Sequence, residues 1–230
     1  MDASAYALVH GVRSTRGALA AWRDRPWNVL KGWLAGSLAA AATLLFAVWV
    51  ISLVSPGGRV ILQHPPLVVG SSRDVVRILG HNLLVLALHA MACVAGFIAG
   101  ASLPMQAVHH HGISRWIHER GGRFAIGFVI CATGFSLTWQ ALALGTSAAR
   151  VASSLHGSSG LLLATLLPHA VPELMALFLP LAAWIVASRR GEWDQLLAAT
   201  IVTVAIAVPV LVITATWEVY VAPHFVRALL

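Results

Sequence analysis

The sequence predicts an all-α protein that crosses a membrane about five times, and its composition and patterning are the basis for this prediction. Only 10% of its 230 residues are charged and 59% are hydrophobic, whereas an average soluble domain carries about 25% charged residues. The apolar residues form long runs without regular polar alternation, which is typical of membrane spans. Because so few charges cannot cover a water-facing surface, we expect a polytopic integral membrane helix bundle.

Five apolar stretches are long enough to cross the hydrocarbon core of a bilayer, which is about 30 Å thick. The first has Trp33 and Trp49 near its ends, as an aromatic belt would place them. The five stretches are residues 33–54, 83–103, 124–145, 161–188 and 196–221. We therefore predict a membrane helix bundle over residues 32–230, preceded by a basic N-terminal segment over residues 1–31.

The N-terminal segment places apolar residues between arginines, with Leu8, Val12, Leu19 and Trp22 as its apolar positions. It forms either an amphipathic helix on the cytoplasmic membrane surface or a short helix that packs against the bundle. In both cases Pro26 should end the helix, because proline lacks a backbone N–H.

The basic residues indicate an orientation. Five spans place ten Lys and Arg residues on the side of the N-terminus and five on the other side. The first group is Arg13, Arg16, Arg23, Arg25, Lys31, Arg115, Arg120, Arg123, Arg189 and Arg190; the second is Arg59, Arg73, Arg77, Arg150 and Arg227. The positive-inside rule then puts the N-terminus in the cytoplasm and the C-terminus outside. These cations flank apolar runs in short groups, so the net charge of +7 does not indicate nucleic-acid binding.

The fourth apolar stretch contains an unusual polar interruption, "LLPHAVPELM" at residues 166–175. Pro168 and Pro172 both lack a backbone N–H and disfavour helical dihedrals in the residue before them. We therefore expect a span broken at Pro168–Pro172, made of two half-helices or re-entrant. Glu173 would then lie in the first turn of the second half-helix, where the helix dipole favours a carboxylate.

Ionisable side chains inside spans usually face a partner or a wet cavity, and this chain has a small set of them. His169 and Glu173 are four residues apart and share a helix face, Glu218 lies in the fifth span, and His81 with Asn82 begins the second. Three readings stay open. The set forms hydrogen bonds that fix the bundle, binds a divalent metal through His169, Glu173 and Glu218, or lines a path for protons or a substrate. We assign no catalytic residue, because "HAVPE" is not the HExxH pattern of metalloproteases.

The second span contains a GxxxG motif formed by Gly96 and Gly100. Two small residues at this spacing allow another helix to approach closely. Packing within the chain and dimerisation explain the motif equally well.

The order and spacing of several of these elements resemble the stage II sporulation protein M family of polytopic membrane proteins, over roughly residues 75–224. The matching elements are His81-Asn82, Gly96 and Gly100, Pro168-His169 with Glu173, and Glu218 shortly before Pro223. The resemblance implies a scaffold in the bacterial cytoplasmic membrane for peptidoglycan-remodelling partners. Some relatives accompany the production and export of circular bacteriocins, so one alternative is a subunit of a transport or peptide-export system with an ABC-type ATPase partner.

An intramembrane enzyme built on His169, Glu173 and Glu218, with or without a metal, is the other alternative. We predict no cofactor beyond that metal. In each case the bilayer and other envelope proteins are the expected partners, and a homo-oligomer is a further possibility.

Overall fold

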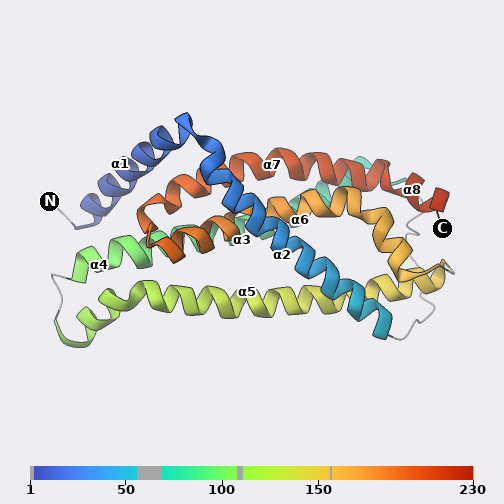
Figure 1. The fold of residues 1–230 in the computed structure, drawn as a ribbon, viewed down its shortest axis with the longest axis horizontal. Helices are drawn as coiled ribbons and strands as arrows, with labels where there is room; N and C mark the ends of the chain where they lie inside the picture. The colour runs from blue at the N-terminus through green and yellow to red at the C-terminus, as the bar shows by residue number, and fades with distance from the viewer. Residues whose placement is uncertain (1–2, 56–68, 108–110, 156, 230) are drawn as a thin grey trace. The chain divides into compact units, whose positions relative to one another are not determined.

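A computed structural model of the chain describes residues 3–55, 69–107, 111–155 and 157–229, and all regular elements in these residues are helical (Figure 1). The elements are α1 (Ala3–Asp24), α2 (Pro26–Val54), α3 (Ser72–Phe97), the π-helix η1 (Ile98–Ser102), α4 (Leu103–Gln106), α5 (Gly112–Ser154), α6 (Ser159–Arg190), the 3-10 helix η3 (Trp193–Gln195), α7 (Leu196–Tyr220) and α8 (Ala222–Leu229). The predicted all-α class is confirmed.

Five of these helical segments are long and apolar enough to cross a membrane, as predicted. They are Pro26–Val54, Ser72–Ala101, Gly112–Ser154, Ser159–Arg190 and Trp193–Tyr220. The third is 43 residues long, about 65 Å at 1.5 Å per residue. Because the hydrocarbon core is about 30 Å thick, α5 must extend beyond it even when tilted.

Contacts divide the chain into two compact units, which we call unit 1 and unit 2. Unit 1 consists of Met1–Ser37, Val85–Thr133 and Leu177–Ala207, and unit 2 of Leu38–Leu84, Gly134–Ala176 and Val208–Leu230. The helices α2, α3, α5, α6 and α7 each contribute residues to both units.

The core of unit 1 forms around the beginning of α2. Trp33 is buried together with Leu179, Ala183 and Ala199, which come from α6 and α7. Trp22 of α1 meets Trp33 edge to face, with 5.3 Å between the ring centroids. The N-terminal helix α1 is therefore part of this packed unit. Pro26 begins α2 after α1 has ended at Asp24, in agreement with the favoured place of proline at the first position of a helix.

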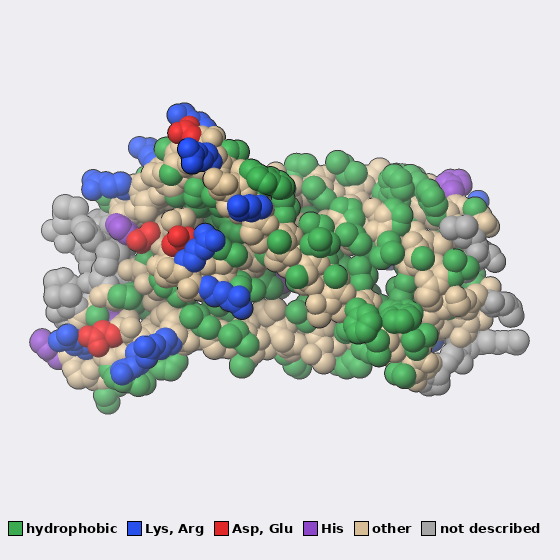
Figure 2. All heavy atoms as spheres, in the orientation of Figure 1, with side chains coloured by type: hydrophobic (Ala, Val, Ile, Leu, Met, Phe, Trp, Pro, Cys, Tyr) green, Lys and Arg blue, Asp and Glu red, His purple; other side chains and the backbone are tan. Residues whose placement is uncertain are grey.

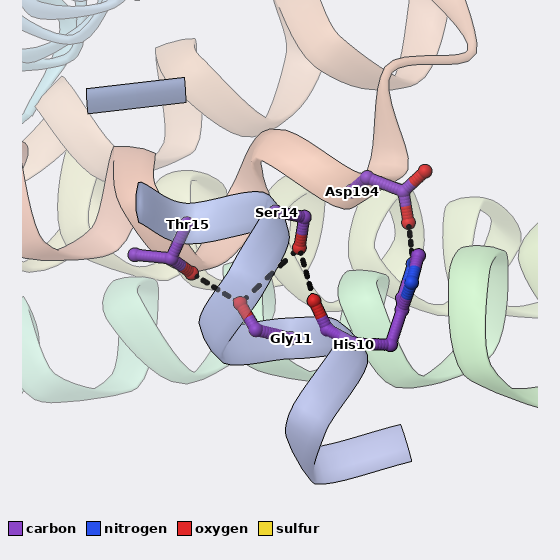
Figure 3. Close-up of polar contacts among 5 residues, drawn as sticks. All are labelled: His10, Gly11, Ser14, Thr15 and Asp194. Carbon is purple, nitrogen blue, oxygen red and sulfur yellow. Dashed lines mark hydrogen bonds and ion pairs between the residues drawn. The ribbon is translucent and has the colours of Figure 1, made fainter. Parts of the chain in front are cut away.

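The first half of α1 contacts η3 and the beginning of α7. His10 Nε2 lies 2.9 Å from Asp194 Oδ1 (Figure 3). A Cβ built on Gly11 would lie 3.1 Å from a methyl group of Leu197 and 3.2 Å from the ring of Phe97, so glycine allows this close approach. The helix α1 therefore packs against η3 and the beginning of α7 within unit 1.

The predicted break in the fourth span is wrong, because α6 is one continuous helix from Ser159 to Arg190. Pro168 and Pro172 both lie inside it, and Figure 1 draws it as a single ribbon that bends along its length. Proline removes one helical hydrogen bond and strains the preceding turn. Within a membrane bundle, neighbouring side chains and small local adjustments satisfy the freed backbone groups, so the helix bends and continues.

Candidate functional site

The beginning of α3 in unit 2 is fixed by a capping arrangement. The backbone N–H and the hydroxyl of Ser71 both donate to Asp74 Oδ2, at 2.9 Å, which satisfies donors at the helix start. Arg77 Nη2 donates to Asp74 Oδ1 at 3.2 Å. Just before the helix, the Gly70 N–H donates to the carbonyl of Val219 in α7 at 3.3 Å. The last of these contacts joins the residue before the cap of α3 to α7.

Further along α3, Asn82 connects this helix to α6. Its Nδ2 donates to Glu173 Oε1 at 2.8 Å, and the Asn82 side chain is only 5% exposed. A hydrogen bond to a carboxylate is shorter and stronger than one between neutral groups. Glu173 therefore has a specific partner on another helix.

Glu218 brings α7 to the same place. Its half-buried carboxyl group interacts electrostatically with Glu173 and with Arg77. Three helices thus contribute to one set of residues, Arg77, Asn82, Glu173 and Glu218, which we call the polar cluster.

The other predicted site residues lie around the polar cluster without a hydrogen bond to it in the described structure. His169 lies one turn before Glu173 and is 6% exposed. Its Nδ1 is buried and has no hydrogen-bond partner among the described residues. Pro168 and His81 are exposed, and Pro172 is half-buried.

The polar cluster does not have the composition of a metal centre. No group of three or more His, Cys, Asp or Glu side chains among the described residues comes together in a way that could hold a metal ion. His169, Glu173 and Glu218, the candidate ligands, therefore do not form a ligand set in the described structure. The geometry supports two other capabilities: connecting α3 to α6 through the Asn82–Glu173 hydrogen bond, and holding a proton near two carboxyl groups.

In unit 1, α3 contacts the helices after it through small residues. A Cβ on Gly96 would lie 2.5 Å from Trp184 Nε1 and 2.9 Å from a Leu196 methyl group. A Cβ on Gly100 would overlap the ring of Trp193. The GxxxG motif of the second span therefore lies against two tryptophans of the same chain.

Two further side chains of α3 bind the backbone of α6 in unit 1. His89 Nδ1 donates to the carbonyl of Leu177 at 2.8 Å, and Cys93 Sγ donates to the carbonyl of Pro180 at 3.2 Å. Pro180 has no N–H to donate to the carbonyl of Ala176, the residue before Leu177. Side-chain donors from α3 thus contact the part of α6 where helical hydrogen bonding is weakened.

Sequence reasoning missed Arg77 as a member of the polar cluster. It counted this residue only as a charge flanking a span. A signal was present, since Arg77 precedes Asn82 by five residues and Glu218 is expected near a cation inside a membrane. The partner of Glu173 could not be chosen from spacing within the fourth span, because it lies on another helix.

Comparison of the chain with protein-family models, with curated proteins and with solved structures found no match. The resemblance to the stage II sporulation protein M family stays a prediction based on the residues named above.

Proposed function

We propose that this chain is an integral subunit or scaffold of a multiprotein complex in the bacterial cytoplasmic membrane, with a role in remodelling the cell envelope like that of stage II sporulation protein M. The observation that carries the proposal is the hydrogen bond from Asn82 to Glu173, with Glu218 beside it. Ionisable groups inside the spans are costly, and here the carboxyl group of Glu173 accepts a hydrogen bond that connects two helices, α3 and α6. A chain whose helices are joined in this way is suited to positioning other proteins in a complex.

A surface for such partners is available on α5. Only 11% of the most apolar part of α5 is buried, whereas 56% of the most apolar part of α6 is buried. Phe135 and Trp139, both in unit 2, are 75% and 66% exposed, and their spacing of four residues places them on one helix face. Lipid or the helices of a partner would cover these aromatic side chains.

The proposal is tested by crosslinked affinity purification from native membranes, with a photo-crosslinking residue in place of Phe135 and mass spectrometry of the captured proteins. We expect a stoichiometric partner such as a peptidoglycan-remodelling enzyme. Glu173→Leu removes the acceptor of Asn82, so protein abundance and partner capture should fall together. Glu173→Gln keeps an oxygen acceptor for Asn82 and should retain both.

Glu119→Gln serves as the matched control, because Glu119 forms an exposed ion pair with Arg115 at 2.7 Å and lies outside the polar cluster. It should leave abundance and capture unchanged. A wild-type protein that is purified without any partner, or a Glu173→Leu protein with normal abundance and partners, would contradict the scaffold function.

The electrostatic interaction between Glu173 and Glu218 favours one second candidate, a membrane subunit of a transport or peptide-export system. Neighbouring carboxylates on different helices can exchange a proton or a small cation. The sequence has no phosphate-binding loop of the GxxxxGK[ST] type, so an ABC-type ATPase would supply the energy. Under this candidate, Glu173→Gln should abolish flux while assembly persists, whereas the scaffold function predicts that this variant remains active.

A further inference from the structure

A cavity of about 310 Å³ lies in unit 1, among α1, the beginning of α2, the end of α6 and the beginning of α7. This volume lies within the range of small-molecule sites. Its walls include Lys31 of α2 and Arg190 of α6, together with the amide side chains of Asn28 and Gln195. The first candidate span begins here, at Pro26, and the fourth ends here, at Arg190.

The two cations of this cavity are available to bind an anion. Neither Lys31 nor Arg190 has an ion-pair partner within the part of the chain that the structure describes. One carboxylate, that of Glu192, also lines the cavity, so the cations outnumber it. Figure 2 shows that Lys and Arg side chains gather over α1 and the beginnings of α2 and α5 on the drawn face of unit 1. An anion is therefore the expected occupant.

A second, apolar cavity of about 190 Å³ adjoins the first. It is lined by Leu19, Leu30 and Val202 among others. Three residues line both cavities: Trp22, Val29 and Trp33. A polar, cationic cavity beside an apolar one matches a molecule with an anionic head and a hydrocarbon chain. Tryptophan rings are also the side chains that favour the boundary between headgroups and hydrocarbon.

We infer that this pair of cavities binds an anionic phospholipid. The headgroup phosphate lies between Lys31 and Arg190, where charge-assisted hydrogen bonds hold it, and an acyl chain lies along the apolar cavity. Basic pockets between membrane helices on the cytoplasmic side have this function in general. The contact between His10 and Asp194 (Figure 3) joins α1 to η3, whose Gln195 lines the polar cavity.

The site is tested on the full chain, delipidated in detergent and titrated with phosphatidylglycerol or phosphatidylcholine while native mass spectrometry counts the bound lipid. The wild-type protein should bind phosphatidylglycerol more tightly than phosphatidylcholine. The double variant Lys31→Gln/Arg190→Gln should weaken phosphatidylglycerol binding by about tenfold or more, because each cation near anionic lipid contributes strongly to binding.

The matched control is Arg25→Gln/Arg189→Gln. It also removes two exposed positive charges, from the α1–α2 junction and the last turn of α6, but neither residue lines the cavity. It should change the affinity by less than about threefold, since only the general surface charge falls. Equal weakening by the two double variants would overturn the site in favour of bulk surface charge.

A cavity-filling variant keeps both cations and tests the space itself. Gly32 lines the polar cavity, and a Cβ there would meet only Val186, at 4.0 Å, so Gly32→Leu should fold. It should weaken phosphatidylglycerol binding at unchanged charge. The phospholipid site would be overturned by unchanged binding in this variant or by equal affinity of the wild type for both lipids. Full competition by inorganic phosphate would also overturn it and would indicate a site for free phosphate.

Discussion

The helices α3 and α6 contact each other in both units of the molecule, but by different chemistry. In unit 2 the contact joins two side chains, Asn82 and Glu173, at 2.8 Å. In unit 1 the side chains of α3 bind backbone carbonyls of α6, at Leu177 and Pro180, and glycines allow close packing. The unit 1 contact depends on shape and on backbone carbonyls, whereas the unit 2 contact depends on the chemical identity of two side chains.

The largest expected effect comes from overfilling the packed contact in unit 1. Gly96→Leu would force a side chain into Trp184 and Leu196. It should destabilise the protein by about 3 kcal/mol or more, because overpacked cores cannot relax. Thermal unfolding in detergent measures this loss. Gly80→Leu on the same helix is the control, since a Cβ there has no neighbour within 4 Å; similar losses in both variants would contradict the packing described for unit 1.

The next effect concerns the contact in unit 2. Asn82→Leu has a similar volume but leaves the Glu173 carboxyl group without its donor, which should cost about 1–3 kcal/mol. Unfolding by a denaturing detergent would report the change. Leu84→Ala is the control, because Leu84 is 60% exposed and should matter little. An Asn82→Leu protein as stable as the wild type would show that the hydrogen bond does not hold α3 against α6.

A smaller effect is expected for His89→Leu, which removes the donor to the Leu177 carbonyl. Hydrogen bonds between membrane helices contribute about 1 kcal/mol or less, so a loss of that size should appear in thermal unfolding. Leu88→Ala on the same helix is the control, because Leu88 is 59% exposed and should matter little. A His89→Leu protein as stable as the wild type would argue against this hydrogen bond.

The smallest effect is expected at the contact between α1 and η3. The side chains of His10 and Asp194 are 31% and 56% exposed, and such contacts are worth at most about 1 kcal/mol. The His10→Ala variant should have nearly the same melting temperature as the wild type. Its helix α1 should resist trypsin as well as the wild-type helix does. Asp24→Asn, on the exposed end of α1, is the control. Rapid cleavage at Arg13 or Arg16 in His10→Ala alone would give this contact a larger role.

The class of the fold and the number of spans follow from the sequence because composition and run length decide them. The helix ends do not follow. We expected the third span to begin at Phe124, whereas α5 begins at Gly112. Charged and polar residues continue the helix beyond the bilayer, and an apolar run cannot reveal such an extension.

The break predicted at Pro168–Pro172 shows a second limit. The effect of proline on an isolated helix is known, but neighbouring helices decide whether the chain bends or breaks. The polar cluster shows the same limit, since the sequence placed Glu173 and Asn82 in one candidate set without indicating that these two residues pair. Spacing within one helix identifies residues that share a face, and it says nothing about the residue that another helix brings to that face.

The most direct test of the account is a double-mutant cycle with Asn82→Ala, Glu173→Ala and the double variant, measured as free energy of unfolding. The account predicts that the two losses are not additive, with a coupling energy of about 1 kcal/mol, because each substitution removes the same hydrogen bond. Additive losses would contradict it, since Asn82 and Glu173 would then stabilise the protein independently and the polar cluster would not connect α3 to α6.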